Sequence, residues 1–382
     1  MADLTTSEHP AASTDAHDAP VQAAALTGTV LVLIQFDVCE EIQLTRLGEI
    51  ISARTIAKPS MKHPAPGYIR YQRPPVVEPI EPLVLETGER LHGEIKYYDY
   101  GVLSVVFQLP FTGDWETLVR LASRWVWDID FAAHAAGIVR QRLERAAPAL
   151  VKPYPEWLSE DYLIFHVREI AGIASAAELL DRHSPLIAQI VRGERSRLAD
   201  SESNEVLQSH ISFYPNDLAV IGWNAAFLYD TVAGAETAIQ LLEYANSQLL
   251  EFRHYDDLLT REMESVYNSL EKGTGLFSRW RMARSANALY SVLLEVMELT
   301  EHADNAIKFL SDMFAARLYR LAATKVGVPD YKKLVTQKLD TAGDLYRFMV
   351  DQFNQSRAFL LELAVVIILV IELIFLFRGK VI

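Results

Sequence analysis

Apolar residues in the first 230 positions fall in short runs that are separated by turn-forming residues. Val30 to Phe36 is rich in β-branched residues, which is typical of a buried strand. Residues 94–98 and 102–108 flank an Asp-Tyr-Gly sequence and predict a hairpin. Asp114 precedes a helical pattern and is a candidate helix N-cap. We therefore expect an α+β fold class, with a mixed domain of short strands and a few helices over residues 29–230.

The pattern changes at Thr231. Apolar residues then recur at helical spacing, glycine is sparse and Pro329 is the only proline, so residues 231–357 predict a stalk of long, coiled-coil-like helices. In the last of these helices the apolar positions alternate in steps of four and three, which is an a/d pattern. This stalk seam consists of Val335, Leu339, Ala342, Tyr346, Met349 and Phe353.

Residues 358–377 are the most apolar stretch of the chain, with only two polar residues among twenty. Twenty helical residues rise ~30 Å, which matches the hydrocarbon core of a bilayer. No proline or glycine separates this stretch from the stalk after Gly343. We therefore predict one C-terminal transmembrane helix that continues the stalk. The implied location is a single-pass membrane protein with its N-terminal bulk in the cytoplasm.

The two polar residues of that stretch are Glu362 and Glu372. At 100° per residue they lie ~80° apart around the helix. Three interpretations stay open: the carboxylates reach the lipid headgroups, they hydrogen-bond between helices of an oligomer, or they line a proton or ion path. The third ranks last, because one span per chain needs several copies to form a pore.

The acidic charge of the chain argues against nucleic acid as a partner. The net charge is −14, and half of it comes from seven carboxylates that precede the first basic residue, Arg46. Phosphates attract lysine and arginine instead. Residues 1–28 contain no basic residue and no apolar core, so we expect a disordered tail and no signal or transit peptide. The single cysteine, Cys39, follows an apolar run and is expected to be a buried structural thiol.

One cluster combines basic and aromatic residues at the start of a long helix. It can be a solvated helix start, a contact with a membrane surface or another partner, or a contact with RNA, in that order of preference. The cluster consists of Phe277, Arg279, Trp280, Arg281 and Arg284.

Motifs for catalysis are absent from the sequence. The ten histidines do not show the spacing of a zinc-binding helix, and a second cysteine is lacking. The sequence also lacks a phosphate-binding loop, a dinucleotide fingerprint and a nucleophile elbow. We therefore predict no catalytic residue, no cofactor and no metal site, and we favour a protein that is not an enzyme.

Two segments resemble the "required for meiotic nuclear division" family, whose function is unknown. One is the tail, where Leu361-Glu362 and Ile371-Glu372 enclose an Ile/Val/Leu run. The other is Ser212 to Asp230, with Asp217 before a strand and Trp223 in its second half. The resemblance implies a divergent, bacterial-type member that is anchored in a membrane by its tail and forms oligomers. Eukaryotic members of that family support translation in mitochondria, and the resemblance implies no catalytic residues.

These observations predict a membrane-anchored, self-associating scaffold or interaction protein, with a supporting role in assembly or translation at the membrane. Its partners are the membrane, a second copy of the chain and unidentified proteins. The alternative is a membrane-tethered enzyme or ligand sensor with its site in the α+β domain, which a pocket of perturbed carboxylates would favour.

Overall fold

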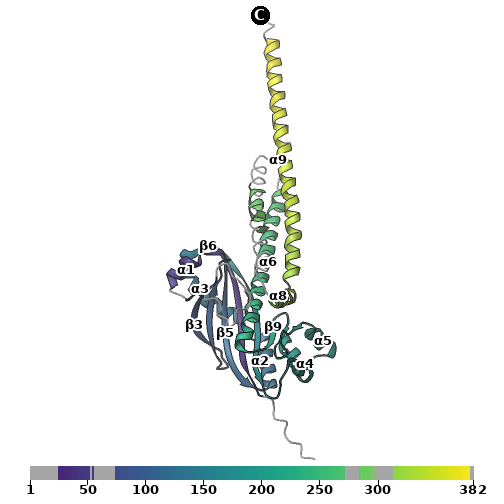
Figure 1. Ribbon diagram of the computed structural model, residues 1–382. Coiled ribbons are helices and arrows are strands. Elements are labelled where there is room, and N and C mark those ends of the chain that lie inside the picture. The colour runs from purple at the N-terminus through teal and green to yellow at the C-terminus, as the bar shows by residue number, and fades with distance from the viewer. Residues whose placement is uncertain are drawn as a thin grey trace, which may run out of the picture.

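The computed structural model describes residues 25–51, 54–55, 74–271, 284, 286–294, 296–297 and 313–378. It consists of a head, which is built around one sheet, and a long helical arm that leaves the head (Figure 1). Most of the predicted N-terminal tail lies outside the described residues, but its last positions do not, because the first strand already begins at Leu26.

Nine strands form a single sheet in the described part of the chain, in the order β2-β3-β4-β5-β1-β6-β9-β8-β7. Neighbouring strands are antiparallel except β6 and β9, which are parallel. The strands are β1 (Leu26–Ile42), β2 (Arg54–Thr55), β3 (Val76–Val84), β4 (Arg90–Tyr97), β5 (Val102–Gly113), β6 (Leu150–Ile170), β7 (His210–Ile211), β8 (Leu218–Ile221) and β9 (Ala225–Tyr229).

The central strand β1 is buried on both sides, and this explains its continuous apolar run. Val30, Val32 and Ile34 point into one core, while Leu31 and Leu33 point into the other. A strand whose alternate side chains both meet apolar layers has no solvent-facing position to fill with polar residues.

Helices cover both faces of the sheet (Figure 1). One face carries α1 (Leu44–Ile51), α2 (Trp115–Trp127), α3 (Phe131–Ala146) and α4 (Ala176–Arg192), with the 3-10 turn η1 (Ala147–Ala149) after α3 and with α5 (Asp200–Leu207) against α4. The other face carries α6 (Val232–Glu271) and α8 (Met313–Val326). The last helix, α9 (Val328–Arg378), packs along α6 and then continues alone.

Local signals placed several elements correctly. The β4–β5 hairpin forms where the Asp-Tyr-Gly turn predicted it. Asp114 caps α2 by accepting a hydrogen bond from the backbone N–H of Thr117 at 2.8 Å. The expected α+β class is supported, but the strands are not all short. β1 has 17 residues and β6 has 21, because the two strands pair with each other along most of their length.

The predicted transmembrane helix is wrong, and the membrane anchor and the single-pass location are wrong with it. No helix in the described part of the chain combines the length and the apolarity that crossing a membrane requires. The apolar residues that predicted this helix from the sequence included residues 358–360 and 363, whose side chains lie outside the part that the structure describes. The side chains described without a gap run from 364 to 376, which is about 20 Å of helix against the ~30 Å of a hydrocarbon core, and Glu372 falls within them.

Candidate functional site

Four polar side chains form a stripe along the first half of α6. Glu243, Ser247, Glu251 and His254 follow one another at steps of four, four and three residues, which places them on one side of a helix. Glu243, Ser247 and His254 are buried. This side of α6 faces the sheet, where an apolar stripe would be the ordinary choice.

A row of polar side chains on the sheet faces this stripe. The strand register places Ser104 of β5 directly opposite both Gln35 of β1 and Lys96 of β4. All three are buried. Asp37 follows two residues after Gln35 and therefore points to the same face. We call these four residues and the four of α6 the polar interface.

An ion pair and a hydrogen bond join the two elements at one end of the polar interface. The ammonium of Lys96 lies 2.7 Å from Oε2 of Glu243. The side-chain amide of Gln35 donates to the backbone carbonyl of Glu243 at 2.9 Å. Burial is the largest single influence on the pKa of Lys96 and lowers it, but the carboxylates of Glu243 and Glu94 together outweigh burial and raise the pKa of the ammonium. The ion pair and the hydrogen bond together fix α6 against β4 and β1.

A histidine and an aspartate meet at the other end. Nδ1 of His254 lies 2.9 Å from Oδ2 of Asp37, and the ring of Tyr154 stacks on the imidazole at a centroid distance of 4.4 Å. Between the two ends, the hydroxyls of Tyr100 and Ser247 lie 3.1 Å apart. Burial raises the pKa of Asp37, and His254 opposes that rise.

Glu251 gives this end of the polar interface a second carboxylate. Burial raises the pKa of Glu251 well above its ordinary value, and the nearby charge of Asp37 adds to the rise. The hydroxyl of Tyr255 donates a hydrogen bond to Glu251. Its other carboxylate oxygen, Oε1, is buried and accepts no hydrogen bond from the residues that the structure describes. Burial therefore favours the protonated form of this carboxyl group, and the charge of the cluster depends on pH.

The groups of this cluster can hold charge and protons. Cys39 lies close by, but burial and the charge of Asp37 raise the pKa of its thiol to about 12. The thiol donates to the carbonyl of Glu41 at 3.3 Å, so it is protonated and inert, as expected for a buried structural cysteine. Within the described residues, no three side chains of metal-ligating type converge.

The predicted stalk seam lies inside one chain. Val335, Ala342 and Met349 are buried in the core that α9 shares with α6 and α8, and Leu339 and Tyr346 pack against the same core. The ring of Tyr346 also stacks on Tyr290 at 5.1 Å. The side chain of the sixth residue, Phe353, lies outside the description. The described part of this seam is therefore occupied by the chain itself.

The other predicted sites have no partner in the described structure that would give them a role. Glu362 and Glu372 are exposed on the far end of α9. Of the basic-aromatic cluster, only Arg284 belongs to the described residues, where it is exposed, and the other members lie outside them. The expectation about this cluster therefore stays a prediction.

The polar interface was not identified from the sequence, although two signals for it are present. The apolar run of β1 ends in Gln35 and Asp37, which still point into the interior. On α6, Glu243, Ser247 and His254 share the side that would otherwise carry apolar residues. Each pattern alone is typical of a strand end or a solvated helix face, and only the register between the two elements brings them together.

The family model for the N-terminal domain of the uncharacterized protein MJ0711 matches residues 27–236, which is more than half of the chain. The chain belongs to this family. The MJ0711 protein of Methanocaldococcus jannaschii is 19% identical over 215 residues, which are 56% of this chain and 65% of that protein. The chain thus aligns with slightly less than two thirds of its relative's length. No solved structure matches the chain.

The MJ0711 domain corresponds to the sheet, the helices α1 to α5 and the first turn of α6. Gln35, Asp37 and Lys96 therefore belong to the family domain, whereas the polar residues of α6 come from the segment that follows it. The polar interface is the place where the family domain holds the helical arm. The resemblance to the "required for meiotic nuclear division" family stays a prediction, because neither match concerns it.

Proposed function

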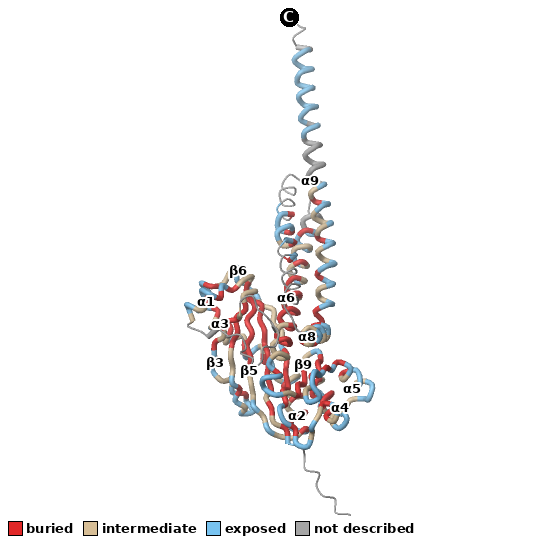
Figure 2. Tube along the Cα trace, viewed as in Figure 1, coloured by how far each residue is buried: buried red, intermediate tan, exposed pale blue. Residues whose placement is uncertain are grey.

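We propose that this protein is a self-associating interaction protein whose copies are joined by the far end of α9. One observation carries the proposal: large apolar side chains are exposed along this end of the helix. Figure 2 draws this end in the pale blue of exposed residues. Twelve of them are between 47% and 71% exposed: Leu361, Val365, Val366, Ile367, Ile368, Leu369, Val370, Ile371, Leu373, Ile374, Phe375 and Leu376. We call residues 361–376 the apolar arm.

A helix that is apolar all round is stable in water only when other groups cover it. Full burial of a Val, Leu, Ile or Phe side chain contributes about 1.5–3 kcal/mol, so half-exposed side chains still offer roughly 1 kcal/mol each. Covering six of them in each of two copies therefore contributes on the order of 10 kcal/mol, which is comparable to the ~4–15 kcal/mol that association costs. For two copies, the free energy gained by burial is therefore only about equal to the cost of association, and the pair is marginally stable.

Three or more copies fit the arm better than two. A helix in a two-stranded coiled coil buries one narrow stripe and leaves the rest exposed. Here seven consecutive residues, Val365 to Ile371, are all apolar and together face every direction around the helix. Three of them are Ile, which favours three- and four-stranded coiled coils when it occupies both core positions. We therefore propose a bundle of at least three arms.

Sedimentation equilibrium of the purified full chain tests this proposal. We expect a mass of at least three chains for the wild type, and a single-chain mass for the double variant Ile367→Glu with Ile371→Glu, which puts two charges on one side of the arm. Phe348→Glu is the matched control, because Phe348 is exposed on the same helix but below the arm. A single-chain mass for the wild type at all concentrations, or an unchanged mass for the double variant, would refute the proposal.

A further inference from the structure

A second exposed surface lies on the head, around α8. Three aromatic side chains are more than half exposed there, namely Phe213, Tyr214 and Trp223. Aromatic side chains are normally buried, and their exposure in a group marks contact surfaces. These three lie in the turns at the two ends of the short strand β8, near the edge of the sheet.

α8 connects the two ends of this surface. The ring of Phe213 lies 5.0 Å from that of Phe314 in the first turn of α8. At the other end, a Cβ on Gly327, directly after α8, would lie 3.9 Å from the ring of Trp223. The helical rise from Phe314 to Gly327 is about 20 Å, which equals the length of about six residues of extended chain.

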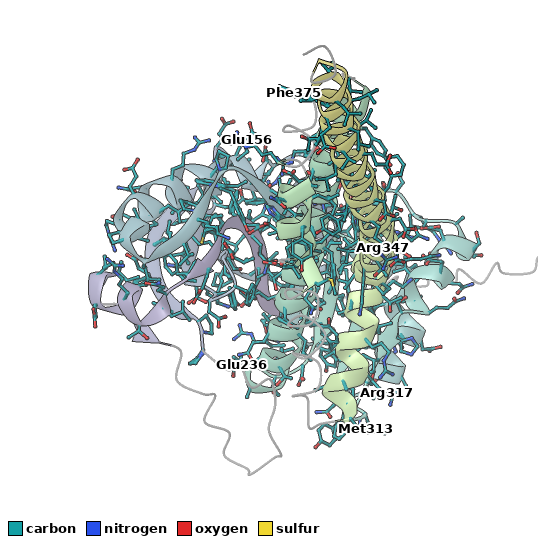
Figure 3. All side chains as sticks on the ribbon, turned by 90° about the horizontal axis from the view of Figure 1, so that it is seen from above. Glu156, Glu236, Met313, Arg317, Arg347 and Phe375 are labelled. Atoms are coloured by element: carbon teal, nitrogen blue, oxygen red, sulfur yellow. The ribbon has the colours of Figure 1, made fainter. Side chains whose placement is uncertain are left out.

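The exposed side of α8 between these aromatic residues is basic. Met313, Arg317, Arg320 and Thr324 are exposed and follow one another at helical spacing. Figure 3 shows Met313 and Arg317 at the outer edge of the molecule, pointing away from the other helices. Neither arginine forms an ion pair with the residues that the structure describes. By contrast, their neighbour Lys325 is paired with Glu205 of α5 at 3.0 Å.

The aromatic side of the surface is held in place before any partner arrives. The backbone N–H groups of Phe213 and Tyr214 donate to the two carboxylate oxygens of Asp217 at 2.7 and 2.8 Å. The rings of Phe213 and Tyr214 then meet edge to face at 4.6 Å. A preorganised pair of rings loses little entropy when it binds.

We propose that this surface, formed by Phe213, Tyr214, Trp223, Arg317 and Arg320, binds an acidic peptide segment that also carries apolar or aromatic side chains. The two arginines supply charge for carboxylates, and Arg, Trp and Tyr are the residues that dominate protein–protein binding energy. A nucleic acid fits less well, because two arginines neutralise few phosphates and the chain as a whole carries a net charge of −14.

Selection of peptides from a random display library on the immobilised full chain tests this inference. We expect the enriched peptides to contain Asp or Glu together with aromatic residues. A synthetic copy of the most enriched peptide should bind the double variant Arg317→Glu with Arg320→Glu, and separately Trp223→Ala, at least tenfold more weakly than the wild type. Arg261→Glu and Tyr267→Ala are the matched controls, since both residues are exposed on α6, and we expect them to bind as the wild type does.

Two outcomes would overturn the proposal. One is enrichment of peptides without acidic residues, or equal affinity of the enriched peptide for the wild type and for the double arginine variant. The other is salt-dependent binding of a labelled 20-nucleotide oligo(U) that the double variant loses and that the enriched peptide fails to displace. Circular dichroism and the urea midpoint of each variant show whether the head remains folded, so that lost binding is attributed to the surface.

Discussion

Lys96 and Glu243 form a buried ion pair, with 2.7 Å between the ammonium and the carboxylate, although 147 positions separate them in the sequence. The pair joins strand β4 to helix α6 and so links the family domain to the helices that follow it. Side chains of this kind are usually fully solvated, and desolvating them is costly unless they meet an opposite charge.

Removing one partner of this pair should strongly destabilise the protein. Glu243→Ala removes the nearer counter-charge of the buried Lys96 ammonium and leaves only Glu94, whose carboxylate is 3.7 Å away. Breaking such buried pairs costs about 3–5 kcal/mol. Urea unfolding followed by circular dichroism measures the loss. The double variant Lys96→Met with Glu243→Leu should recover most of the stability, because apolar pairs of similar volume replace buried ion pairs well. Equal losses in the single and double variants would contradict this account.

Glu251→Gln should stabilise the protein, and the gain should grow with pH. The pKa of Glu251 is raised in the folded state, chiefly by burial, so the folded protein retains a proton that the unfolded chain releases. Stability is therefore lost as pH rises from the unfolded pKa, near the ordinary value of 4.5, through the raised folded pKa. The amide carries no charge and avoids this loss.

The gain is expected to be on the order of 1 kcal/mol at pH 8 and to vanish near pH 4. Thermal unfolding of the wild type and Glu251→Gln across this range measures it. Glu264→Gln, at an exposed position of the same helix, is the control. A gain that is independent of pH would show that the removed charge is not the cause.

Cys39 should react very slowly with alkylating reagents in the folded protein. Its pKa is raised to about 12 by burial and by the charge of Asp37, so almost no thiolate exists at pH 8, and the side chain is buried. We expect complete labelling by iodoacetamide in 8 M urea, and labelling at least 100-fold slower in its absence, as measured by intact mass. Rapid labelling of the native protein would mean that this end of the polar interface opens readily.

The low reactivity of Cys39 allows the direction of the arms to be measured. A cysteine in place of Ile368 should form a disulfide between copies under mild oxidation if the arms run parallel, because identical positions then lie side by side. A cysteine in place of Phe348, exposed below the arm on the same helix, is the control and should give far less dimer on a non-reducing gel. Equal crosslinking at both positions would indicate random collision.

Asp217→Ala should loosen the aromatic surface on the head without unfolding it. The carboxylate accepts hydrogen bonds from the N–H groups of Phe213 and Tyr214, and removing such a local acceptor costs about 1 kcal/mol. We expect a slightly lower urea midpoint and about tenfold weaker binding of the selected acidic peptide. Asp217→Asn, which keeps one acceptor oxygen, should lie between the alanine variant and the wild type.

Local sequence signals predicted the elements of this fold better than their arrangement. The Asp-Tyr-Gly turn and the Asp114 cap each act within a few residues, and each was placed correctly. The length of β6 was missed, because two prolines and four polar residues interrupt residues 150–160, which extend only through pairing with the distant strand β1. The polar interface was missed for a related reason, since its two halves are about 150–200 positions apart.

At the C-terminal end of α9, the number of apolar residues led to a wrong prediction. Its composition predicted a membrane span, but the count drew on side chains outside the described structure and treated Glu372 as a tolerated exception. The stalk seam shows the opposite case: the spacing of Val335, Ala342 and Met349 identified buried positions, whereas it could not tell whether the chain or a second copy would cover them. Spacing alone does not identify the partner helix.

The single helix α6 has a mechanical consequence. Its first half is fastened to the sheet by Lys96 and Asp37, and its second half lies along α9, where Lys338 of α9 is 2.6 Å from Asp256. The head and the helical arm therefore share one continuous helix, α6, and are not joined by a hinge at this point. If the apolar arms of several copies form a bundle, a change in the orientation of one head is transmitted through α6 and α9 to the other copies. The heads of such an assembly would then turn together.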